Sequence, residues 1–331
     1  MSGIIVNPKN YTGRELETIF FRPLMSGPSI ESLGIRVLYN MPVPTVVQLW
    51  DRTGNVLQSF DEASKWSGGS KSVHYQKTIP LHRVKAENAF SASDYFSTIF
   101  ELITNRSDVN MEDLSGTELE AAETELFRNA IADSIRMNLW LGDKGGTHNT
   151  GYTSFDGLLK IIQERIKEGA LHFSDNDLDG RLGDYTIKEI FDQHIANASP
   201  RLKGLFKDGQ AAFFVSPDLY SAYEHYLDET FSPVTYGDTQ NGRPTLKYHG
   251  FPVVEVNLEP AISSSTLSRN FCIFTDRRNL VMAVNTADTP GSEVRMWYNP
   301  DEMENRQRAV FAIGCESLDE DLMSAYMNIT E

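Results

Sequence analysis

The chain has 331 residues, 40% of them hydrophobic and 23% charged, a composition typical of a folded globular protein. Its formal net charge of −16 argues against a general nucleic-acid-binding protein, because phosphate contacts need clustered Lys and Arg. It contains no run of eighteen apolar residues and no secretory signal pattern at its start, which excludes a transmembrane helix and a secreted precursor of the usual kind.

Residues 1–44 contain five prolines and little periodicity, which predicts an extended segment. The apolar side chains in this segment, among them Phe20, Phe21 and Leu24, are too numerous for a disordered tail. We therefore expect an ordered arm whose apolar groups are buried either against this chain or against a neighbouring copy.

Residues 45–90 alternate between apolar and polar side chains on both sides of a Gly68-Gly69 pair, which predicts a long β-hairpin. Six basic residues against four acidic ones make this segment mildly basic within an acidic chain. A two-stranded hairpin has only marginal stability on its own, so we expect it to pack against another surface. Complementary charge favours the acidic surface of another copy as that partner.

A short helix is predicted over residues 91–105, followed by the longest helix of the chain from Ser115 to Gly142. Ser115 and Glu118 have the spacing of a capping box, and Gly142 supplies a stop. Two apolar rows at helical spacing make a stripe wider than a surface helix usually needs. The rows are Leu119, Ala122, Leu126 and Ala130, and beside them Phe127, Ile131, Ile135 and Leu139.

The chain then alternates between helices and strands. A helix is predicted from about Phe155 to Glu168, and residues 170–260 have the pattern of an α/β lobe, with a buried strand over 211–215 that turns into a helix at Ser216-Pro217. Residues 261–331 are rich in strands that are expected to return to the long helix. Two of their apolar runs are separated by residues 276–279, which predicts a hairpin.

The best chemical motif is the run from Asp175 to Gly180, which has Asp175, Asp177 and Asp179 at the spacing of a calcium loop. Position twelve of such a loop is Thr186 here, where a bidentate Glu is needed. Because that substitution removes two ligand oxygens, the motif remains a weak calcium candidate, and an acidic surface loop or helix cap is favoured.

No other pattern indicates catalysis or a cofactor. The seven histidines are scattered without metal-ligand spacing, and neither a nucleophile elbow nor a glycine-rich phosphate loop is present. Cys272 and Cys315 stand in apolar, strand-like contexts, so we expect reduced core thiols. The sequence thus predicts a non-enzymatic protein with no cofactor.

The order of these elements, from arm and hairpin to long helix, α/β lobe and late strands, resembles the HK97-like fold of tailed-bacteriophage major capsid proteins. The stretches that carry the resemblance cover most of the chain. They are LFRNAIADSIRMNLWLGD with GYTSFDGLLKII, AAFFVSPDLYSAYEHYL, LKYHGFPVVEV, FCIFTDRRNLVMAV and RAVFAIGCE.

The resemblance implies an α+β subunit that assembles with its own copies into hexamers and pentamers of an icosahedral shell around double-stranded DNA. It implies an N-terminal arm at 1–44, an E-loop at 45–90, a peripheral domain at 91–169 with the spine helix at about 115–142, an axial domain at about 170–260, and returning strands at 261–331. It also implies a virion protein assembled in the host cytoplasm, with no membrane and no sequence-specific DNA contact. The partners to expect are a separate scaffolding protein, a portal and possible decoration proteins.

Two other functions remain open from the sequence. One is the shell of an encapsulin-type nanocompartment, which shares the fold but packages enzymes. The other is an unrelated α+β cytoplasmic protein that binds calcium or acts as an enzyme.

Overall fold

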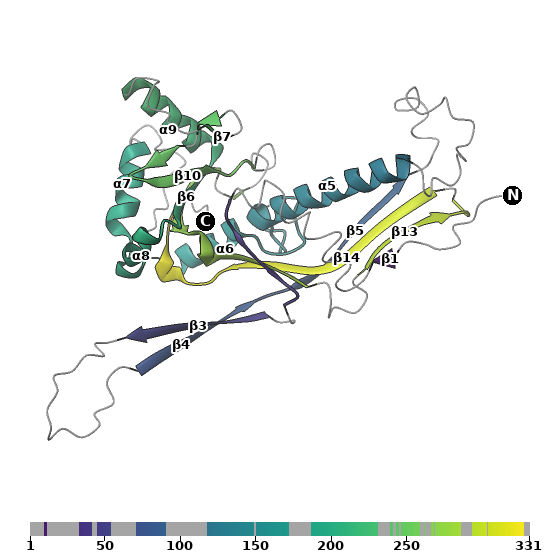
Figure 1. The fold of residues 1–331 in the computed structure, drawn as a ribbon, viewed down its shortest axis with the longest axis horizontal. Coiled ribbons are helices and arrows are strands. Elements are labelled where there is room, and N and C mark those ends of the chain that lie inside the picture. The colour runs from purple at the N-terminus through teal and green to yellow at the C-terminus, as the bar shows by residue number, and fades with distance from the viewer. Residues whose placement is uncertain are drawn as a thin grey trace, which may run out of the picture.

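The computed structural model has two β-sheets, a long helix and a projecting two-stranded hairpin (Figure 1). It describes residues 10–11, 33–41, 45–53, 71–90, 118–148, 150–171, 187–230, 239–240, 243–244, 246–258, 262, 266–267, 269–285, 293–302 and 304–327. The short helix predicted at 91–105, the calcium-loop candidate and most of the predicted arm lie outside these residues.

The first sheet has six strands and is built around the long strand β14. Its strands are β1 (Asn10–Tyr11), β2 (Arg36–Tyr39), β5 (His82–Phe90), β12 (Leu280–Asn285), β13 (Glu293–Asn299) and β14 (Glu304–Ser317). Strands β13 and β12 pair one after the other along one edge of β14, and β5 pairs along the opposite edge. Of the described strands, only β14 pairs with β5.

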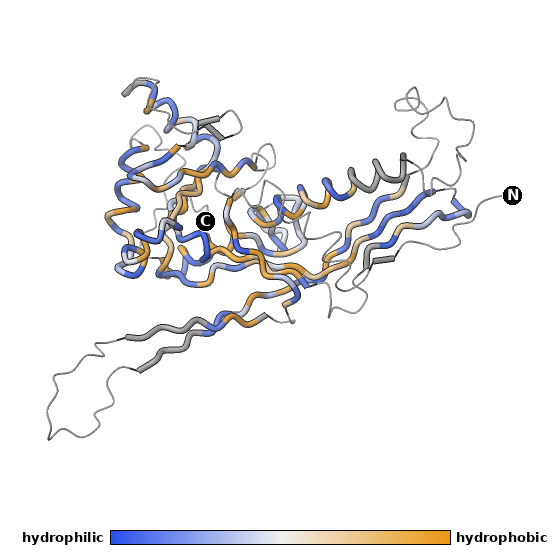
Figure 2. Tube along the Cα trace, in the orientation of Figure 1, coloured by the Kyte–Doolittle hydropathy of each residue, from blue (hydrophilic) through white to orange (hydrophobic). Residues whose placement is uncertain are grey.

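Along β14 the first five residues are polar and the following ones are mostly apolar, as the colours of Figure 2 show. Side chains alternate between the two faces of a strand. On β5, Val84 and Ala86 are half-buried toward the helix side, whereas Arg83, Lys85 and Glu87 are exposed. The part of this sheet that contains β5 therefore has one face covered by the helix and one face exposed to solvent.

The long helix α5 (Glu118–Leu141) covers the inner face of the six-stranded sheet and agrees with the predicted helix to within a few residues (Figure 1). Its second predicted row is buried, with exposed fractions of 6% or less at Phe127, Ile131, Ile135 and Leu139. From the first row, Ala130 is exposed. None of the described helices is both long and apolar enough to cross a membrane.

The second sheet has five strands and is covered on both faces. Its strands, in spatial order, are β15 (Met323–Met327), β11 (Phe271–Asp276), β6 (Ala211–Val215), β10 (Phe251–Glu255) and β9 (Lys247–Tyr248). The helices around it are α6 (Leu158–Lys167), α7 (Ile187–Asn197), α8 (Pro200–Leu205) and α9 (Pro217–Thr230).

Strand β6 shows why both faces are buried. Phe213 packs on the α7–α9 side, whereas Phe214 packs with the core beneath α5. A strand buried on both faces needs a continuous apolar run, which is the pattern of residues 211–215. Trp140, near the end of α5, stacks on Phe271 and lies against Phe214, so the end of the helix joins the two sheets.

The remaining elements are short. They are the 3-10 turns η3 (Phe206–Asp208), η6 (Arg277–Asn279) and η7 (Glu320–Leu322), and the small pair of strands β7 (Thr239–Gln240) and β8 (Arg243–Pro244). The hairpin predicted around residues 276–279 is wrong, because β11 and β12 belong to different sheets and η6 carries the chain between them. Strands β11 and β15 likewise lie in the five-stranded sheet, whereas β12, β13 and β14 lie under α5.

A buried histidine in the second core makes stability depend on pH. The ring of His194 on α7 is fully buried, with Nδ1 2.7 Å from the Ser324 hydroxyl, and burial lowers its pKa to about 3. An unfolded histidine titrates near 6.5, so the unfolded state binds an extra proton between about pH 6.5 and pH 3. The contribution of the neutral His194 ring to the free energy of unfolding is therefore present above pH 6.5 and is lost as the pH falls.

The variant His194→Gln keeps a polar partner for Ser324 but does not titrate. We expect its free energy of unfolding to fall less than that of the wild type when the pH is lowered from 7 to 4.5. The difference is roughly 2–3 kcal/mol from the two pKa values. Urea unfolding at both pH values measures it, with the exposed His225→Gln as the control. Equal losses in wild type and His194→Gln would contradict the assignment.

Candidate functional site

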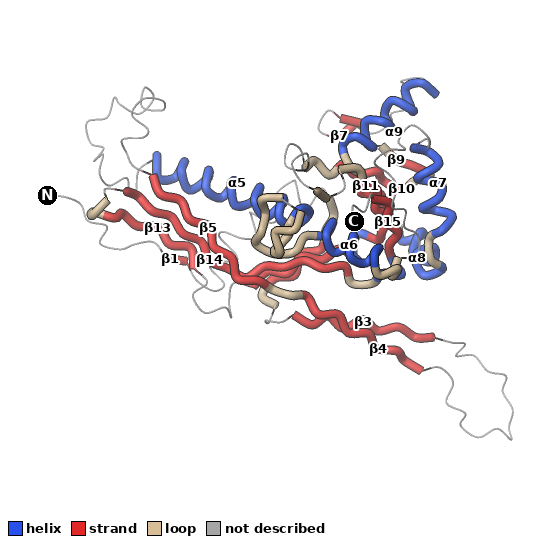
Figure 3. The backbone as a smooth tube through the Cα atoms, turned by 180° about the vertical axis from the view of Figure 1, so that it is seen from behind, coloured by secondary structure: helices blue, strands red, loops and turns tan. Residues whose placement is uncertain are grey.

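A two-stranded hairpin projects from the body of the molecule, away from the five-stranded sheet and from α5 (Figures 1 and 3). Strand β3 (Thr45–Thr53) pairs with β4 (Lys71–Ile79) in antiparallel register, from Thr45 opposite Ile79 to Thr53 opposite Lys71. Neither strand pairs with a third one in the described part of the chain. Because an isolated hairpin is marginal, its base must supply the stability.

The base of the hairpin has its own small apolar core. Ile79 at the end of β4 is fully buried against Val281, Ala283 and Leu318, with Val47 of β3 packed alongside. Val281 and Ala283 come from β12, so this core lies on the opposite face of the sheet from α5. Full burial of an Ile side chain contributes roughly 2–3 kcal/mol, which anchors the hairpin to the sheet.

A chain of charges clamps the same end of the hairpin. The Lys77 ammonium on β4 lies 2.6 Å from the Glu320 carboxylate in η7, and Nε of Arg165 on α6 lies 3.3 Å from the same oxygen. Burial alone would raise the pKa of Glu320, but the hydrogen bond from Lys77 and the two positive charges outweigh it and lower the pKa. Nearby, burial raises the pKa of Glu316.

Backbone geometry fixes where the chain leaves the hairpin. Between β4 and β5 the chain passes directly over β14 at Gly314, where an added Cβ atom would lie 2.0 Å from the carbonyl oxygen of Pro80. A non-bonded carbon and oxygen cannot approach so closely, so only glycine fits at position 314 in this arrangement. The direction of the hairpin is therefore set by a residue of the central strand.

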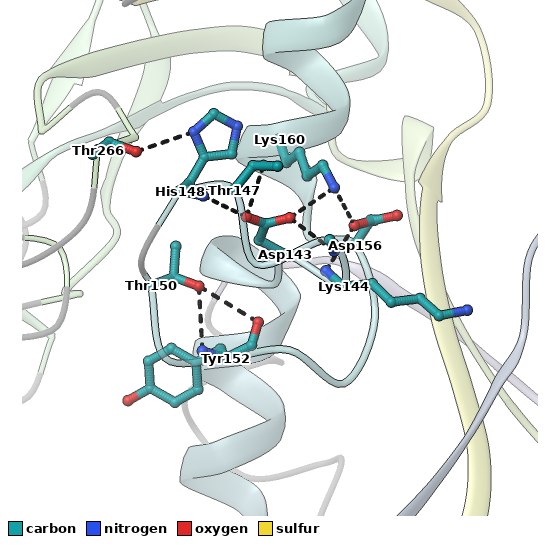
Figure 4. A network of polar contacts seen from close by, with 10 residues as sticks. Asp143, Lys144, Thr147, His148, Thr150, Tyr152, Asp156, Lys160 and Thr266 are labelled. Carbon is teal, nitrogen blue, oxygen red and sulfur yellow. Dashed lines mark hydrogen bonds and ion pairs between the residues drawn. The ribbon is translucent and has the colours of Figure 1, made fainter.

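A turn with many polar contacts follows α5 (Figure 4), and this polar turn contacts the start of β5 through Lys144 and His82. The fully buried Asp143 carboxylate accepts hydrogen bonds from the backbone N–H groups of Gly145 and His148 and from the Thr147 hydroxyl, and forms an ion pair with Lys160 at 2.8 Å. Burial alone would raise the pKa of Asp143, but the bonds from Lys160, His148 and Thr147 outweigh it and lower the pKa to about 2.

The polar turn is connected to the elements around it. Lys160 of α6 also contacts Asp156 at 2.6 Å, and the Lys144 ammonium lies 3.1 Å from Nδ1 of His82, the first residue of β5. Burial, followed by the charge of Lys144, lowers the pKa of His82, which keeps the ring neutral beside the ammonium. The turn thus joins α5, α6 and the beginning of the strand that continues from the hairpin.

Two glycines hold the end of α5 against the start of α6. The N–H of Gly157 donates to the carbonyl of Gly142 at 2.8 Å. A Cβ atom on Gly157 would lie 2.6 Å from the Gly142 nitrogen and 2.7 Å from the Asn138 carbonyl oxygen. Side chains are excluded at this crossing, which places Asp143 and Lys160 within reach of one another.

These contacts hold the hairpin, the helices and the strands in place relative to one another. Cys272 and Cys315 are fully buried and burial raises the pKa of both thiols, so neither resembles an activated nucleophile. Within the described ranges, no group of three metal-ligating side chains comes together. Asp175, Asp177 and Asp179, the weak calcium candidate, lie outside those ranges.

The residues of the hairpin base and of the polar turn were not singled out from the sequence. The stretch after Gly142 has the composition of a loose loop, although it contains an Asp followed by Gly-Gly and Thr, a pattern suited to a carboxylate that accepts from its own turn. Glu320 and Gly314 gave no local signal, since their partners Lys77 and Pro80 are remote in sequence.

We expect Lys77→Met to loosen the hairpin base, because Lys77 is the only residue of the charge cluster that lies on the hairpin. Both side chains keep some exposure, 19% and 27%, so solvent still screens the pair, and its loss should lower the free energy of unfolding by about 1 kcal/mol. Hydrogen exchange of the β4 amides should be severalfold faster than in wild type. The control is Lys85→Met, which removes an exposed pair on β5. Unchanged β4 exchange in Lys77→Met would show that the cluster does not hold the hairpin.

No known protein-family model matches this sequence, and no curated protein matches it. Solved structures do match its fold over nearly the full length. A chain from the satellite phage P4 procapsid, in a structure that includes the size determination (Sid) protein, has a TM-score of 0.55 at 12% identity, covering 94% of this chain and 98% of that chain.

Two further matches come from other particles. A chain from the capsid of the native GTA particle has a TM-score of 0.51 at 13% identity, covering 92% of this chain and 91% of that one. A chain from the capsid of cyanophage P-SCSP1u has a TM-score of 0.52 at 9% identity, covering 92% and 89%. The chain therefore has the α+β fold of HK97-like capsid proteins.

Proposed function

We propose that this chain is a major capsid protein that assembles with its own copies into the hexamers and pentamers of an icosahedral shell enclosing double-stranded DNA. The observation that carries the proposal is the fold, which matches capsid chains over nearly their whole length and its own. The role is structural, and no cofactor is required for it.

The projecting hairpin supports a role that needs other copies. Its described strands are anchored only at the base, by the Ile79 core and the Lys77 cluster, and lie outside the two-sheet body. A two-stranded hairpin that lies away from the core of its own subunit adds little stability to that subunit. In a shell the hairpin would lie on a neighbouring subunit, where its excess of basic residues suits the acidic surface of the chain.

We assign the parts of the subunit by analogy with this fold. Residues 1–44 would be the N-terminal arm, and 45–90 would contain the E-loop, with β5 as the strand that leads it into the sheet. Residues 91–169 would form the peripheral domain around the spine helix α5, and 170–260 most of the axial domain. The late strands, 261–331, are shared between both sheets, which would tie the two domains together.

The proposed partners follow from the same role. Copies of this chain would be the main partners, with a separate scaffolding protein, a portal and decoration proteins acting at assembly. The place of the protein would be the virion capsid, built in the host cytoplasm. A net charge of −16 is consistent with a shell that encloses DNA without binding it tightly, because acidic residues repel phosphate groups.

Electron microscopy of the purified chain tests the proposal. Shells or hexameric rings are expected at high concentration or with a crowding agent, and a chain that stays monomeric under both conditions would overturn it. Nuclease-protected double-stranded DNA inside particles from the native source would identify a virion, whereas protected enzyme cargo without DNA would identify a nanocompartment.

A variant with a shortened hairpin tests whether the hairpin is needed for assembly. Thr53 stands opposite Lys71 in the register, so an Asn-Gly turn can join these two residues directly. This variant should melt like the wild type, because both cores and the hairpin base are kept, and should form no shells. Normal shells from it would refute the assembly role of the hairpin.

A further inference from the structure

Two adjacent arginines in η6 have different electrostatic surroundings. The guanidinium of Arg278 lies 2.7 Å from the Asp276 carboxylate and 3.1 Å from that of Asp208, and these contacts raise its pKa. Arg277 is half-buried, and its buried Nε has no hydrogen-bond partner among the described residues. Burial lowers the pKa of the Arg277 guanidinium, and no described carboxylate opposes that shift. Because an arginine keeps its charge in a protein, Arg277 lacks a counter-ion in the described part of the subunit.

The side chain of Arg277 is held against the backbone just before β2. A Cβ atom added to Gly34 would lie 2.6 Å from Cδ of Arg277 and 3.1 Å from its Nη1. Gly34 has a φ of +73°, a conformation that glycine adopts without strain. The arginine stem therefore lies on bare backbone, which fixes the position of the guanidinium. A planar guanidinium that is fixed in this way is pre-organised to bind an anion.

This guanidinium lies at an edge of the six-stranded sheet. Strand β2 begins two residues after Gly34, and among the described strands it pairs only with β12. Arg36, the first residue of β2, is exposed and adds a second positive charge to this edge. The edge is thus positively charged and lies where another molecule can approach it.

The charge of the whole chain indicates which anion suits this edge. The chain has 46 acidic and 30 basic residues, so every copy presents an excess of carboxylates. A guanidinium binds a carboxylate through two parallel hydrogen bonds, which makes a carboxylate a good partner for one fixed arginine. Nucleic acid is less suitable, because tight phosphate binding needs many clustered basic residues and a net charge of −16 opposes it.

We propose that the Arg277 guanidinium binds a carboxylate of a second copy of this chain when subunits assemble. The inference rests on the proposed function, because the two copies meet in the shell. It has a distinctive consequence for the energetics. In the isolated subunit the half-buried charge is uncompensated and lowers stability, whereas in the assembly it is paired. Removal of the charge should therefore stabilise the isolated subunit and weaken assembly.

The substitution Arg277→Met tests both effects, because it keeps an apolar stem and removes the charge. The dilute variant should unfold at a higher urea concentration than the wild type. The protein concentration needed to form shells, measured by light scattering, should rise at least about tenfold. The control Arg278→Met removes a guanidinium that is paired within its own chain. It should be less stable than the wild type and should assemble at nearly the wild-type concentration.

The variant Arg277→Lys identifies the partner acid. A carbodiimide joins a lysine to a carboxylate in contact with it, and mass spectrometry of mixed labelled and unlabelled chains distinguishes links between copies from links within one chain. We expect a link between copies that forms only in assembled particles. A link within the dilute chain would overturn the inference, because it would reveal an internal partner.

The assembly results separate the contact from the proposed function. If wild type forms shells and Arg277→Met forms them at the same concentration, or is less stable than wild type when dilute, the contact is refuted and the proposed function stands. Normal Arg277→Met shells that lose protected DNA would also refute the contact and would make phosphate the partner. A wild-type chain that forms no shells would refute the proposed function and the contact with it.

Discussion

The substitution Gly314→Ala is expected to destabilise the subunit by roughly 3 kcal/mol and to prevent normal assembly. The added methyl group would lie 2.0 Å from the Pro80 carbonyl oxygen and 3.0 Å from its carbon, both of them backbone atoms. Since no side-chain rotation relieves this clash, either β14 or the crossing at Pro80 must move. Movement at Pro80 would redirect the hairpin and pull Ile79 out of its small core.

Urea unfolding measures the loss of stability, and electron microscopy measures assembly. The matched control is Gly204→Ala, on helix α8, where an added Cβ meets no atom within 4 Å. It should be neutral or stabilising by up to about 1 kcal/mol, because alanine favours a helix over glycine. If Gly314→Ala were as stable as the control and assembled normally, the crossing at Pro80 would not fix the hairpin.

The elements that local pattern specifies were predicted well. The helix predicted from Ser115 to Gly142 is observed over Glu118–Leu141, because an apolar row at helical spacing and a glycine stop are both local signals. The buried run before Ser216-Pro217 likewise became β6 followed by α9. In both places the residues that define the element lie within it.

The pairing of strands was predicted less well, for a physical reason. Residues 71–79 and 82–90 have similar alternation, but the first strand pairs with β3 and the second with β14. What separates them is the crossing at Pro80, which requires a glycine far along the chain at position 314. Strand alternation indicates which side chains share a face and leaves the partner strand open.

The candidate site was harder to predict for the same reason. Asp143 looks like a surface loop residue until Lys160 of the next helix and the His148 backbone are placed around it. Glu320 likewise gains meaning only when Lys77 and Arg165 converge on it from two other elements. Charged residues are rarely buried, so a prediction from sequence places them on the surface. In this chain they are buried where elements from distant parts of the sequence meet.

The substitution Asp143→Ala should cost roughly 3–5 kcal/mol, the usual loss when one partner of a buried ion pair is removed. It leaves the N–H groups of Gly145 and His148 without their acceptor and deprives Lys160 of its buried counter-charge. Because the same turn contacts His82 through Lys144, the start of β5 should also become more mobile. Urea unfolding at pH 7 and hydrogen exchange of the β5 amides measure the two effects.

The pH dependence separates the charge of Asp143 from its shape. The folded pKa of about 2 lies below the ordinary value of 3.8, so its contribution is present above pH 3.8 and is lost as the pH falls toward 2. That loss amounts to about 2 kcal/mol in wild type and should be absent in Asp143→Asn. The double variant Asp143→Asn with Lys160→Met should be more stable than Asp143→Asn alone, since no buried ammonium is left beside the amide. If the double variant were the less stable of the two, the pair of Lys160 with Asp156 or the packing of Lys160 would outweigh the cost of leaving its ammonium beside the amide.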